Sequence, residues 1–332
     1  QVWGTSFPSF PYTTNHKGHG PAVGGSLFEN NAEYGMGMWL SVEQQRSKLA
    51  MHAQALADLT DDEAVKEAAL NWIANIDDTE GSVVSGEAFK KAIEAHAATD
   101  AEKADIAEIK ANYDQLTKKS VWFFGGDGWA YDIGYGGLDH VLASGANVNV
   151  MVFDTEIYSN TGGQASKSTP TGAVAQFAAA GKRNKKKDLG MMAMSYGDVY
   201  VAQVAMGANP AQFLKAVLEA ESYNGPSLII AYAPCISHGL RCGMSDVQGE
   251  IKRAVEVGYW HLYRHDPRLA AEGKNPFVLD SKEPQGDFRA FLRGEVRFSS
   301  LERTFPEVAD ELFKKTEKEA MARYAKYKAL AQ

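Results

Sequence analysis

The pattern of hydrophobic and polar positions divides the chain into regions of different texture. Residues 1–40 are rich in glycine, proline, asparagine and aromatic residues without clear periodicity, which predicts a loop-rich start. Residues 41–118 place alanine, leucine and charged residues at helical spacing, as in VEQQRSKLAMHAQALADL, and predict a helical insertion. From Ser120 onward, short apolar runs alternate with helical patterns.

The region after Ser120 predicts an α/β fold. Apolar runs predict strands at residues 120–124, 147–154, 199–206 and 227–233. Helical patterns lie between or after them, at residues 129–145, 173–181 and 209–222. Strands that alternate with helices predict a doubly wound parallel sheet, with a βαβ core at 119–245. Asn209 and Pro210 would cap and start the last of these helices, and residues 246–332 predict a C-terminal helical tail.

Charge and composition exclude several classes of function. A formal net charge of -8 argues against nucleic acid as the main partner. No apolar stretch approaches the roughly 18 to 20 residues that span a bilayer, so we expect no membrane association. Two cysteines, Cys235 and Cys242, are too few for a disulfide framework, and a reducing cytoplasm is the expected location. The chain does not start with Met, which is expected of a fragment or a processed chain.

The run FFGGDGWAYDIGYGG, residues 123–137, concentrates glycines around one carboxylate, Asp127. It follows a predicted strand and precedes a predicted helix, the position at which open α/β sheets bind ligands. Glycines allow close backbone approach, and the start of a helix favours an anion. Asp127 would then be a hard oxygen ligand for Mg²⁺. A tight turn is the alternative, and the glycines alone do not decide between the two.

The next predicted strand ends in Asp154 and Thr155, and Thr155 lies 28 positions after Asp127. If the two strands are neighbours, the Asp127 carboxylate and the Thr155 hydroxyl lie near one metal ion. The backbone carbonyl of Ile157 can also turn inward once the strand has ended. With two phosphate oxygens and a water, these groups complete an octahedral shell.

This pair of motifs resembles the thiamine diphosphate-binding part of the pyruvate:ferredoxin oxidoreductase family. Most thiamine diphosphate enzymes have Asn-Asn where this chain has Asp154 and Thr155. Similar stretches run through nearly the whole chain and are sparsest in the helical insertion. They include WGTSFPSFPYTTN, SLFENNAEYG, YSNTGGQASKSTPTGAVAQFAAAGK, PSLIIAYAPCISHGL, GYWHLYRHDPRL and KNPFVLDSK.

The resemblance implies a role for each matching residue. Asp127 and Thr155 would bind Mg²⁺ through their side chains, and Ile157 through its carbonyl. The diphosphate loop would be shaped by Gly126, Gly128 and Trp129. Asn160 would face the thiazolium ring and the substrate, where a side-chain amide stabilises developing negative charge. By spacing alone, a turn residue in a polar loop is the preferred interpretation of Asn160.

Cys235 follows a predicted strand at the same sheet edge. A lone cysteine there is commonly a buried thiol. The resemblance instead implies that Cys235 is the last ligand of a [4Fe–4S] cluster, which takes four thiolates. The other three would lie upstream of this chain, and Cys242 has no counterpart in the family pattern.

The resemblance also implies an activity and partners. Pyruvate would be oxidatively decarboxylated with coenzyme A to acetyl-CoA and CO₂, and electrons would pass through iron–sulfur clusters to ferredoxin or flavodoxin. Residues 1–332 would form one thiamine diphosphate-binding domain of a larger, homodimeric enzyme. Its N-terminal domains would supply a glutamate for the aminopyrimidine ring, so we expect the fragment alone to be inactive.

Three alternatives stay open: a related enzyme for another 2-oxoacid, a non-redox thiamine diphosphate enzyme, and a non-catalytic diphosphate-binding module. Other features weigh less. His16 and His19 lie in a glycine-rich loop that gives little support for metal binding. The run from Lys182 to Lys187, KRNKKK, predicts a solvated loop, or a patch for coenzyme A phosphates or an acidic ferredoxin. No role is assigned to the stretch 29–31 (Glu29, Asn30 and Asn31).

Overall fold

The computed structural model describes residues 24–25 and 31–332 of the chain. His16, His19, Glu29 and Asn30 lie outside the described residues. The chain forms two compact units. One is Met36–Val121, and the other consists of Trp122–Gln332 with the described residues up to Gly35. Within the described part of the chain, no helix is long and apolar enough to cross a membrane.

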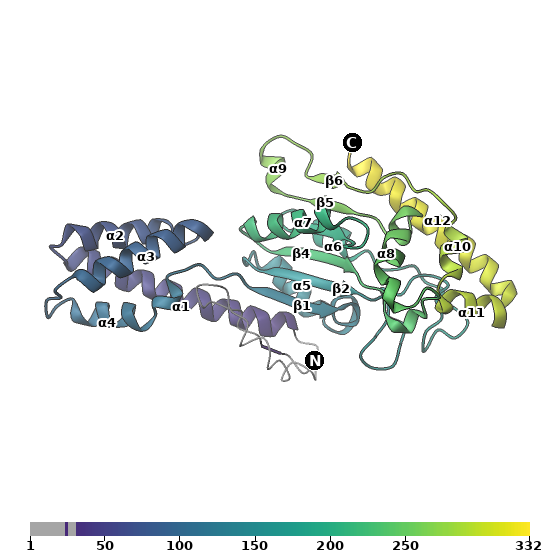
Figure 1. Ribbon diagram of the computed structural model, residues 1–332, viewed down its shortest axis with the longest axis horizontal. Helices are drawn as coiled ribbons and strands as arrows, with labels where there is room; N and C mark the ends of the chain where they lie inside the picture. Colours follow the sequence, from purple (N-terminus) through teal and green to yellow (C-terminus); the bar gives the residue numbers. More distant parts are fainter. Residues whose placement is uncertain (1–23, 26–30) are drawn as a thin grey trace. The chain divides into compact units, whose positions relative to one another are not determined.

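The unit Met36–Val121 is helical, as the spacing predicted (Figure 1). Its helices are α1 (Asn31–Leu59), α2 (Glu63–Ala74), α3 (Thr79–Ala95), α4 (Lys103–Ala111) and the short η3 (Tyr113–Gln115). The first turns of α1 belong to the other unit. The prediction of loops up to residue 40 was therefore wrong from Asn31 onward. Gly35 suggested a loop, but a Cβ there would lie 2.4 Å from the Phe123 ring, so this glycine serves close packing within a helix.

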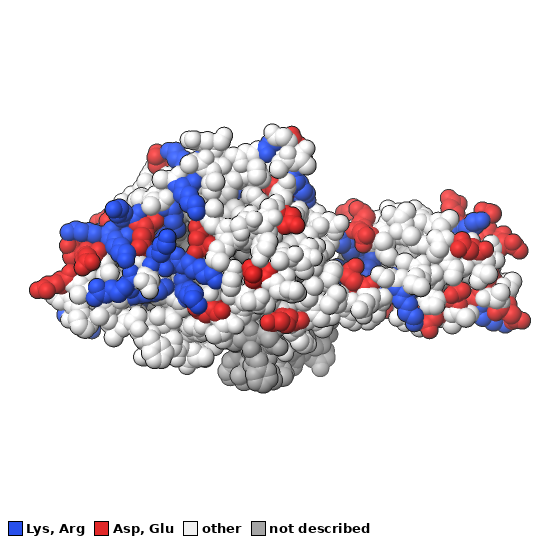
Figure 2. Space-filling view, turned by 180° about the vertical axis from the view of Figure 1, so that it is seen from behind, with Lys and Arg blue, Asp and Glu red and all other residues white. Residues whose placement is uncertain are grey.

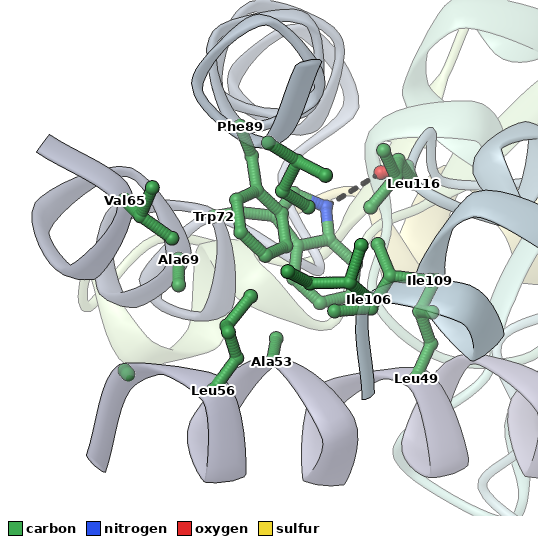
Figure 3. Packing of buried hydrophobic residues seen from close by; sticks show 12 residues of the cluster. Leu49, Ala53, Leu56, Val65, Ala69, Trp72, Phe89, Ile106, Ile109 and Leu116 are labelled. Carbon is green, nitrogen blue, oxygen red and sulfur yellow. Dashed lines mark hydrogen bonds between the residues drawn. The ribbon is translucent and has the colours of Figure 1, made fainter. Parts of the chain in front are cut away.

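Trp72 lies at the centre of the core of the helical unit (Figure 3). Its ring stacks on Phe89 at a centroid distance of 6.0 Å, and its indole N–H donates to the carbonyl of Leu116 at 2.8 Å. Leu56 and Ile109 are also fully buried around it. This unit thus has a hydrophobic core of its own.

The other unit is built on a six-stranded sheet in the order β1-β2-β4-β3-β5-β6. The strands are β1 (Trp122–Gly126), β2 (Asn149–Asp154), β3 (Tyr200–Val204), β4 (Ser227–Tyr232), β5 (Tyr263–His265) and β6 (Phe277–Leu279). The first four strands in this order, β1, β2, β4 and β3, run parallel, which confirms the predicted parallel sheet. The two short strands β5 and β6 add to it in antiparallel orientation. Sequence analysis did not predict them, because three residues carry no readable period.

Helices cover both faces of this sheet, as expected of a doubly wound fold. On one face, Tyr200, Ala202 and Ile229 pack with Ala216 and Ala220 of α7 (Pro210–Ser222). On the other face, Gly190 of α6 (Leu189–Met194) lies against Ile230 and Tyr263. The predicted cap of α7 is confirmed, because the Asn209 side chain accepts from the amide of Gln212 at 3.0 Å.

The predicted helical tail is confirmed by α8 (Val247–Glu256), α9 (Arg268–Ala271), α10 (Phe288–Arg293), α11 (Val296–Thr304) and α12 (Pro306–Leu330), although β5 and β6 also lie within it. Before the tail lie η4 (Gly128–Ile133), α5 (Tyr135–Ala143), η5 (Ile236–His238) and η6 (Met244–Asp246). α12 is the long C-terminal helix drawn in yellow in Figure 1.

The predicted helix at 173–181 is wrong. This alanine-rich segment forms short turns, and several of its backbone amides bond to residues outside the segment instead of continuing a helical ladder. The Val174 amide donates to the Arg297 carbonyl at 2.7 Å, and the Gln176 amide donates to the Gly163 carbonyl at 2.8 Å. Gly172 and Gly181 have positive φ at its two ends, at 81° and 75°. Long-range pairing therefore overrides the local helix propensity of alanine.

Candidate cofactor site

The first loop of the candidate site begins where β1 ends. Asp127 follows Gly126 and is 1% exposed. A Cβ on Gly125 would lie 2.3 Å from the Trp129 ring, and one on Gly128 would lie 2.4 Å from the Tyr158 ring. A Cβ on Gly126 would meet no described atom within 4 Å. Two of the glycines thus allow close packing, while Gly126 leaves open space.

The second loop begins where the neighbouring strand β2 ends. β1 and β2 are parallel and in register from Trp122↔Asn149 to Gly126↔Phe153, so Asp127 and Thr155 leave the sheet side by side. The Thr155 hydroxyl lies 2.6 Å from Asp127 Oδ1 and 2.9 Å from the Ile157 carbonyl oxygen. Glu156, which lies between Thr155 and Ile157 in the chain, adopts a φ of 55°. The resulting turn brings the Ile157 carbonyl back to the Thr155 hydroxyl.

These three oxygens fit a divalent cation. The Thr155 hydroxyl has one proton but faces two acceptors, Asp127 Oδ1 and the Ile157 carbonyl, so it cannot satisfy both. In an octahedral Mg²⁺ shell with bonds of about 2.0–2.1 Å, neighbouring oxygens are about 2.9 Å apart, close to the spacing here. Burial, together with the nearby Asp154, raises the pKa of Asp127 to about 7. A cation would stabilise the ionised carboxylate that this environment disfavours.

A hollow of about 320 Å³, open to solvent, lies beside these oxygens. The described residues that line it are Phe124–Trp129 of the first loop, Phe153, Thr155, and 157–161 of the second. Asn160 is exposed at this hollow. Trp129 is 1% exposed, and its indole N–H has no acceptor among the described residues. The residues predicted to bind the cofactor on these two loops therefore border one space: Gly126, Asp127, Gly128, Trp129, Thr155, Ile157 and Asn160.

Asp154 points away from that space. Its carboxylate accepts from Tyr131 at 2.8 Å, from Lys186 at 2.7 Å and from the Ser168 hydroxyl. Lys186 also reaches Glu156 at 3.0 Å. Asp154, at the position where most thiamine diphosphate enzymes have asparagine, is thus paired with Lys186.

The prediction that the run from Lys182 to Lys187 is a solvated loop was wrong for three of its cations. Lys182 donates to the Ser166 carbonyl at 2.8 Å, Lys186 binds the two acids, and Lys187 donates to the Tyr131 carbonyl at 3.1 Å. Burial lowers the pKa of Lys182 and of Lys187 to about 8. Lys186 turns inward because the buried acids of the second loop need a counter-charge, whereas Lys182 and Lys187 turn inward onto backbone carbonyls.

The exposed cations of the run are Arg183 and Lys185. Lys315 of α12 donates to the Arg183 carbonyl at 2.6 Å, so this lysine lies beside the run. Figure 2 shows Lys and Arg side chains gathered on one face of the sheet-containing unit. This surface is basic although the whole chain is acidic.

Cys235 lies in the loop that follows β4, the neighbour of β2. Its thiol is buried and accepts from the Ser237 amide at 3.4 Å. The Ala233 amide donates to the Asp154 carbonyl at 3.0 Å, so this loop starts beside the second loop. Cys242 is exposed, with its sulfur 3.9 Å from Glu250 Oε2. In the part of the chain that the structure describes, no three His, Cys, Asp or Glu side chains gather as a metal site.

Sequence analysis missed the buried ions behind the two loops. Burial would raise the pKa of Glu156, but Lys186 and Arg297 outweigh it and lower this pKa to about 2. Burial, followed by the charge of Arg297, lowers the pKa of His238 to about 3, so His238 is neutral. Burial raises the pKa of Glu295 to about 7 against the opposing charge of Arg297. Among these residues, only Glu156 carried a signal in the sequence, because it lies between two predicted metal ligands, Thr155 and Ile157.

Comparison with known proteins agrees with this geometry. The profile of the family described as "Thiamine pyrophosphate enzyme, C-terminal TPP binding domain" matches residues 103–231, which contain both loops. The chain is 56% identical over 331 residues to the pyruvate-flavodoxin oxidoreductase of Klebsiella pneumoniae, covering 99% of this chain and 28% of that protein. It is 57% identical over 333 residues to the pyruvate:ferredoxin oxidoreductase of Moorella thermoacetica, covering 100% of this chain and 28% of that protein.

This chain is homologous to the pyruvate:ferredoxin oxidoreductases along its whole length. The model of the thiamine pyrophosphate-binding domain covers residues 103–231, and the chain spans about 28% of the length of these two relatives. A protein with another electron acceptor in its name is also similar, the pyruvate dehydrogenase [NADP(+)] of Euglena gracilis. It is 48% identical over 333 residues, covering 100% of this chain and 18% of that protein.

Proposed function

We propose that this chain forms the magnesium and diphosphate half of the active site of a pyruvate:ferredoxin or pyruvate:flavodoxin oxidoreductase. The observation that carries the proposal is the convergence of Asp127, Thr155 and the Ile157 carbonyl at the carboxyl ends of two parallel strands. The relatives with the same domain are named for this activity.

In this proposal Mg²⁺ binds to the Asp127 carboxylate, the Thr155 hydroxyl and the Ile157 carbonyl. Ser166 holds the other carboxylate oxygen of Asp127 at 2.5 Å and so fixes the direction of Oδ1. The diphosphate would approach the backbone at Gly126, and Gly128 would shape the loop by its close packing against Tyr158. The buried indole N–H of Trp129 is a donor without an acceptor among the described residues at the same hollow. Thiamine diphosphate, when bound, supplies the carbanion chemistry that a protein side chain cannot.

Asn160 is the residue of this chain that we propose to contact the substrate. It is exposed at the rim of the hollow, and a side-chain amide there would donate to the substrate oxygen that becomes negative. Pyruvate and coenzyme A would be converted to acetyl-CoA, CO₂, two electrons and a proton.

Cys235 would be one thiolate of a [4Fe–4S] cluster that receives those electrons singly. The other three thiolates and the glutamate that supports the aminopyrimidine ring would come from parts of the enzyme outside residues 1–332. The full-length enzyme would be a homodimer. Ferredoxin or flavodoxin would be the acceptor. Two free cysteines fit a cytoplasmic enzyme.

The test is pyruvate-dependent reduction of a low-potential dye, with coenzyme A, thiamine diphosphate and Mg²⁺. We expect the full-length enzyme to reduce the dye and residues 1–332 alone not to. Asp127→Ala in the full-length enzyme should abolish Mg²⁺-dependent cofactor binding and dye reduction together. Full-length enzyme that binds the cofactor but never reduces the dye would contradict the proposal.

Cys235→Ser separates this proposal from a non-redox thiamine diphosphate enzyme. We expect the variant to lose dye reduction and to change the spectrum of the iron–sulfur centres. Unchanged pyruvate turnover in this variant would favour the non-redox enzyme.

A further inference from the structure

One histidine joins the two loops of the proposed site that come from different strands. We call residues 154–157 the metal loop and residues 235–239 the cysteine loop. His238 lies three positions after Cys235 and is completely buried. Its Nε2 lies 2.7 Å from the carbonyl oxygen of Thr155. Because a carbonyl only accepts, Nε2 carries the proton and donates it to the metal loop.

A set of buried ions stands behind this contact. Arg297 of α11 donates to Glu156 Oε2 at 2.8 Å and to Glu295 Oε2 at 2.6 Å. The Glu295 Oε1 atom in turn lies 3.8 Å from His238 Nδ1. Arg297 is 3% exposed, and the other three are at most 1% exposed. The side chains thus run from the metal loop through α11 back to the cysteine loop.

The same ions hold the metal loop in an unfavourable backbone conformation. Glu156 has a φ of 55°, which side chains other than glycine rarely adopt. Its carboxylate is held by Arg297, by Lys186 and by the Tyr259 hydroxyl at 2.5 Å. This conformation turns the Ile157 carbonyl toward the Thr155 hydroxyl, so the ion pairs maintain the spacing of two proposed metal ligands.

We propose that His238 is a positioning residue that fixes the metal loop relative to the cysteine loop. With Glu156, Glu295 and Arg297 behind it, it makes the magnesium–diphosphate site and the cluster ligand Cys235 one geometric unit. The proposal rests on the proposed function. It adds that the two cofactors share one support.

The chain offers a matched control, His261. It is also buried, at 1% exposed, and its Nε2 also lies against a backbone carbonyl, that of Ala320 at 3.1 Å. Ala320 belongs to α12, however, and not to either loop. Replacement of His261 therefore reproduces the loss of a buried histidine and its hydrogen bond without cutting the link between the loops.

The experiment compares full-length enzyme with His238→Leu, His238→Gln and His261→Leu. Three quantities are measured: the Mg²⁺ concentration that half-saturates thiamine diphosphate binding by calorimetry, the electron paramagnetic resonance spectrum of the reduced clusters, and the melting temperature. Loss of a residue that orients a metal ligand typically costs 10–100-fold in metal affinity. We expect His238→Leu to raise the half-saturating Mg²⁺ concentration by about tenfold or more and to change the cluster spectrum.

His238→Gln keeps an N–H donor near the position of Nε2, and we expect it to restore much of both properties. His261→Leu should lower the melting temperature but leave both properties as in the wild type. The proposal is overturned if His238→Leu behaves as His261→Leu does. Wild-type enzyme without Mg²⁺-dependent cofactor binding would instead overturn the proposed function, and the wild-type arm alone would reveal it.

Discussion

At the scale of single residues, Gly126 is a position where a substitution should affect ligand binding without affecting the stability of the fold. A Cβ at this position would meet no described atom within 4 Å. We therefore expect Gly126→Ala to leave the melting temperature unchanged but to weaken thiamine diphosphate binding, because the added methyl group occupies the space where the diphosphate approaches the backbone. Calorimetry in the presence of Mg²⁺ measures the affinity.

The control for that variant is Gly136→Ala in α5. Gly136 also has open space at its Cβ position, and it does not line the hollow. Alanine there should raise stability by up to about 1 kcal/mol through its higher helix propensity and leave cofactor binding unchanged. If Gly126→Ala also binds the cofactor normally, the diphosphate does not lie over this loop.

Lys186 is a second single residue on which the stability of a buried group of charges depends. It pairs with Asp154 and Glu156, and its side chain is 12% exposed. Removal of one partner of a buried ion pair costs about 3–5 kcal/mol, because the other charges stay buried without compensation. We expect Lys186→Met to lose that much stability in urea unfolding. Lys185→Met, one position away and exposed, should change stability by no more than about 0.5 kcal/mol.

At the scale of elements, the ends of α2, α3 and α4 meet at His96. Its Nδ1 lies 2.9 Å from Asp62, the cap of α2, and its Nε2 lies 3.2 Å from Glu102, which precedes α4. The hydrogen bond to Glu102, followed by the one to Asp62, raises the pKa of His96 above its usual 6.5. Protonation of His96 therefore stabilises these helices.

A raised pKa in the folded state sets the direction of the pH dependence. The contribution of His96 is complete below pH 6.5 and is lost as the pH rises through the higher pKa of the folded state. We expect hydrogen-exchange protection of α2 and α3, corrected for intrinsic rates, to fall above this pH. His96→Gln should show a flatter profile, and an equally steep profile in this variant would assign the effect to another group.

Elements with a local pattern could be predicted, and elements set by distant contacts could not. The strands β1–β4 and the cap of α7 followed from apolar runs and from Asn209. The segment 173–181 failed because its amides bond to Gly163 and Arg297, far away in the sequence. The grouping of Asp127, Thr155 and Ile157 could be predicted, because all three lie at the ends of strands that the local pattern predicts as neighbours. His238, Arg297 and Lys186 were not, because only the tertiary structure brings a loop, a helix and a basic run to those strand ends.

At the scale of the whole molecule, two cores predict two separate responses to core mutations. Trp72 is completely buried in the helical unit, and Ile230 is completely buried in the sheet. We expect Trp72→Ala, at a cost of about 3–5 kcal/mol, to lower hydrogen-exchange protection in Met36–Val121 and not in the strands. Ile230→Ala should do the reverse. Equal loss in both units after either mutation would show that they unfold as one.

The contact between Gly35 and Phe123 has a consequence for how this chain can be rearranged. Gly35 is the last residue before the helical unit and Phe123 follows its end, and a Cβ on Gly35 would lie 2.4 Å from the Phe123 ring. The points where the chain leaves and re-enters the sheet-containing unit are therefore neighbours, and a few residues would bridge them. The helical unit has the anatomy of a module that can be excised, exchanged or replaced by a reporter domain while the cofactor loops keep their scaffold.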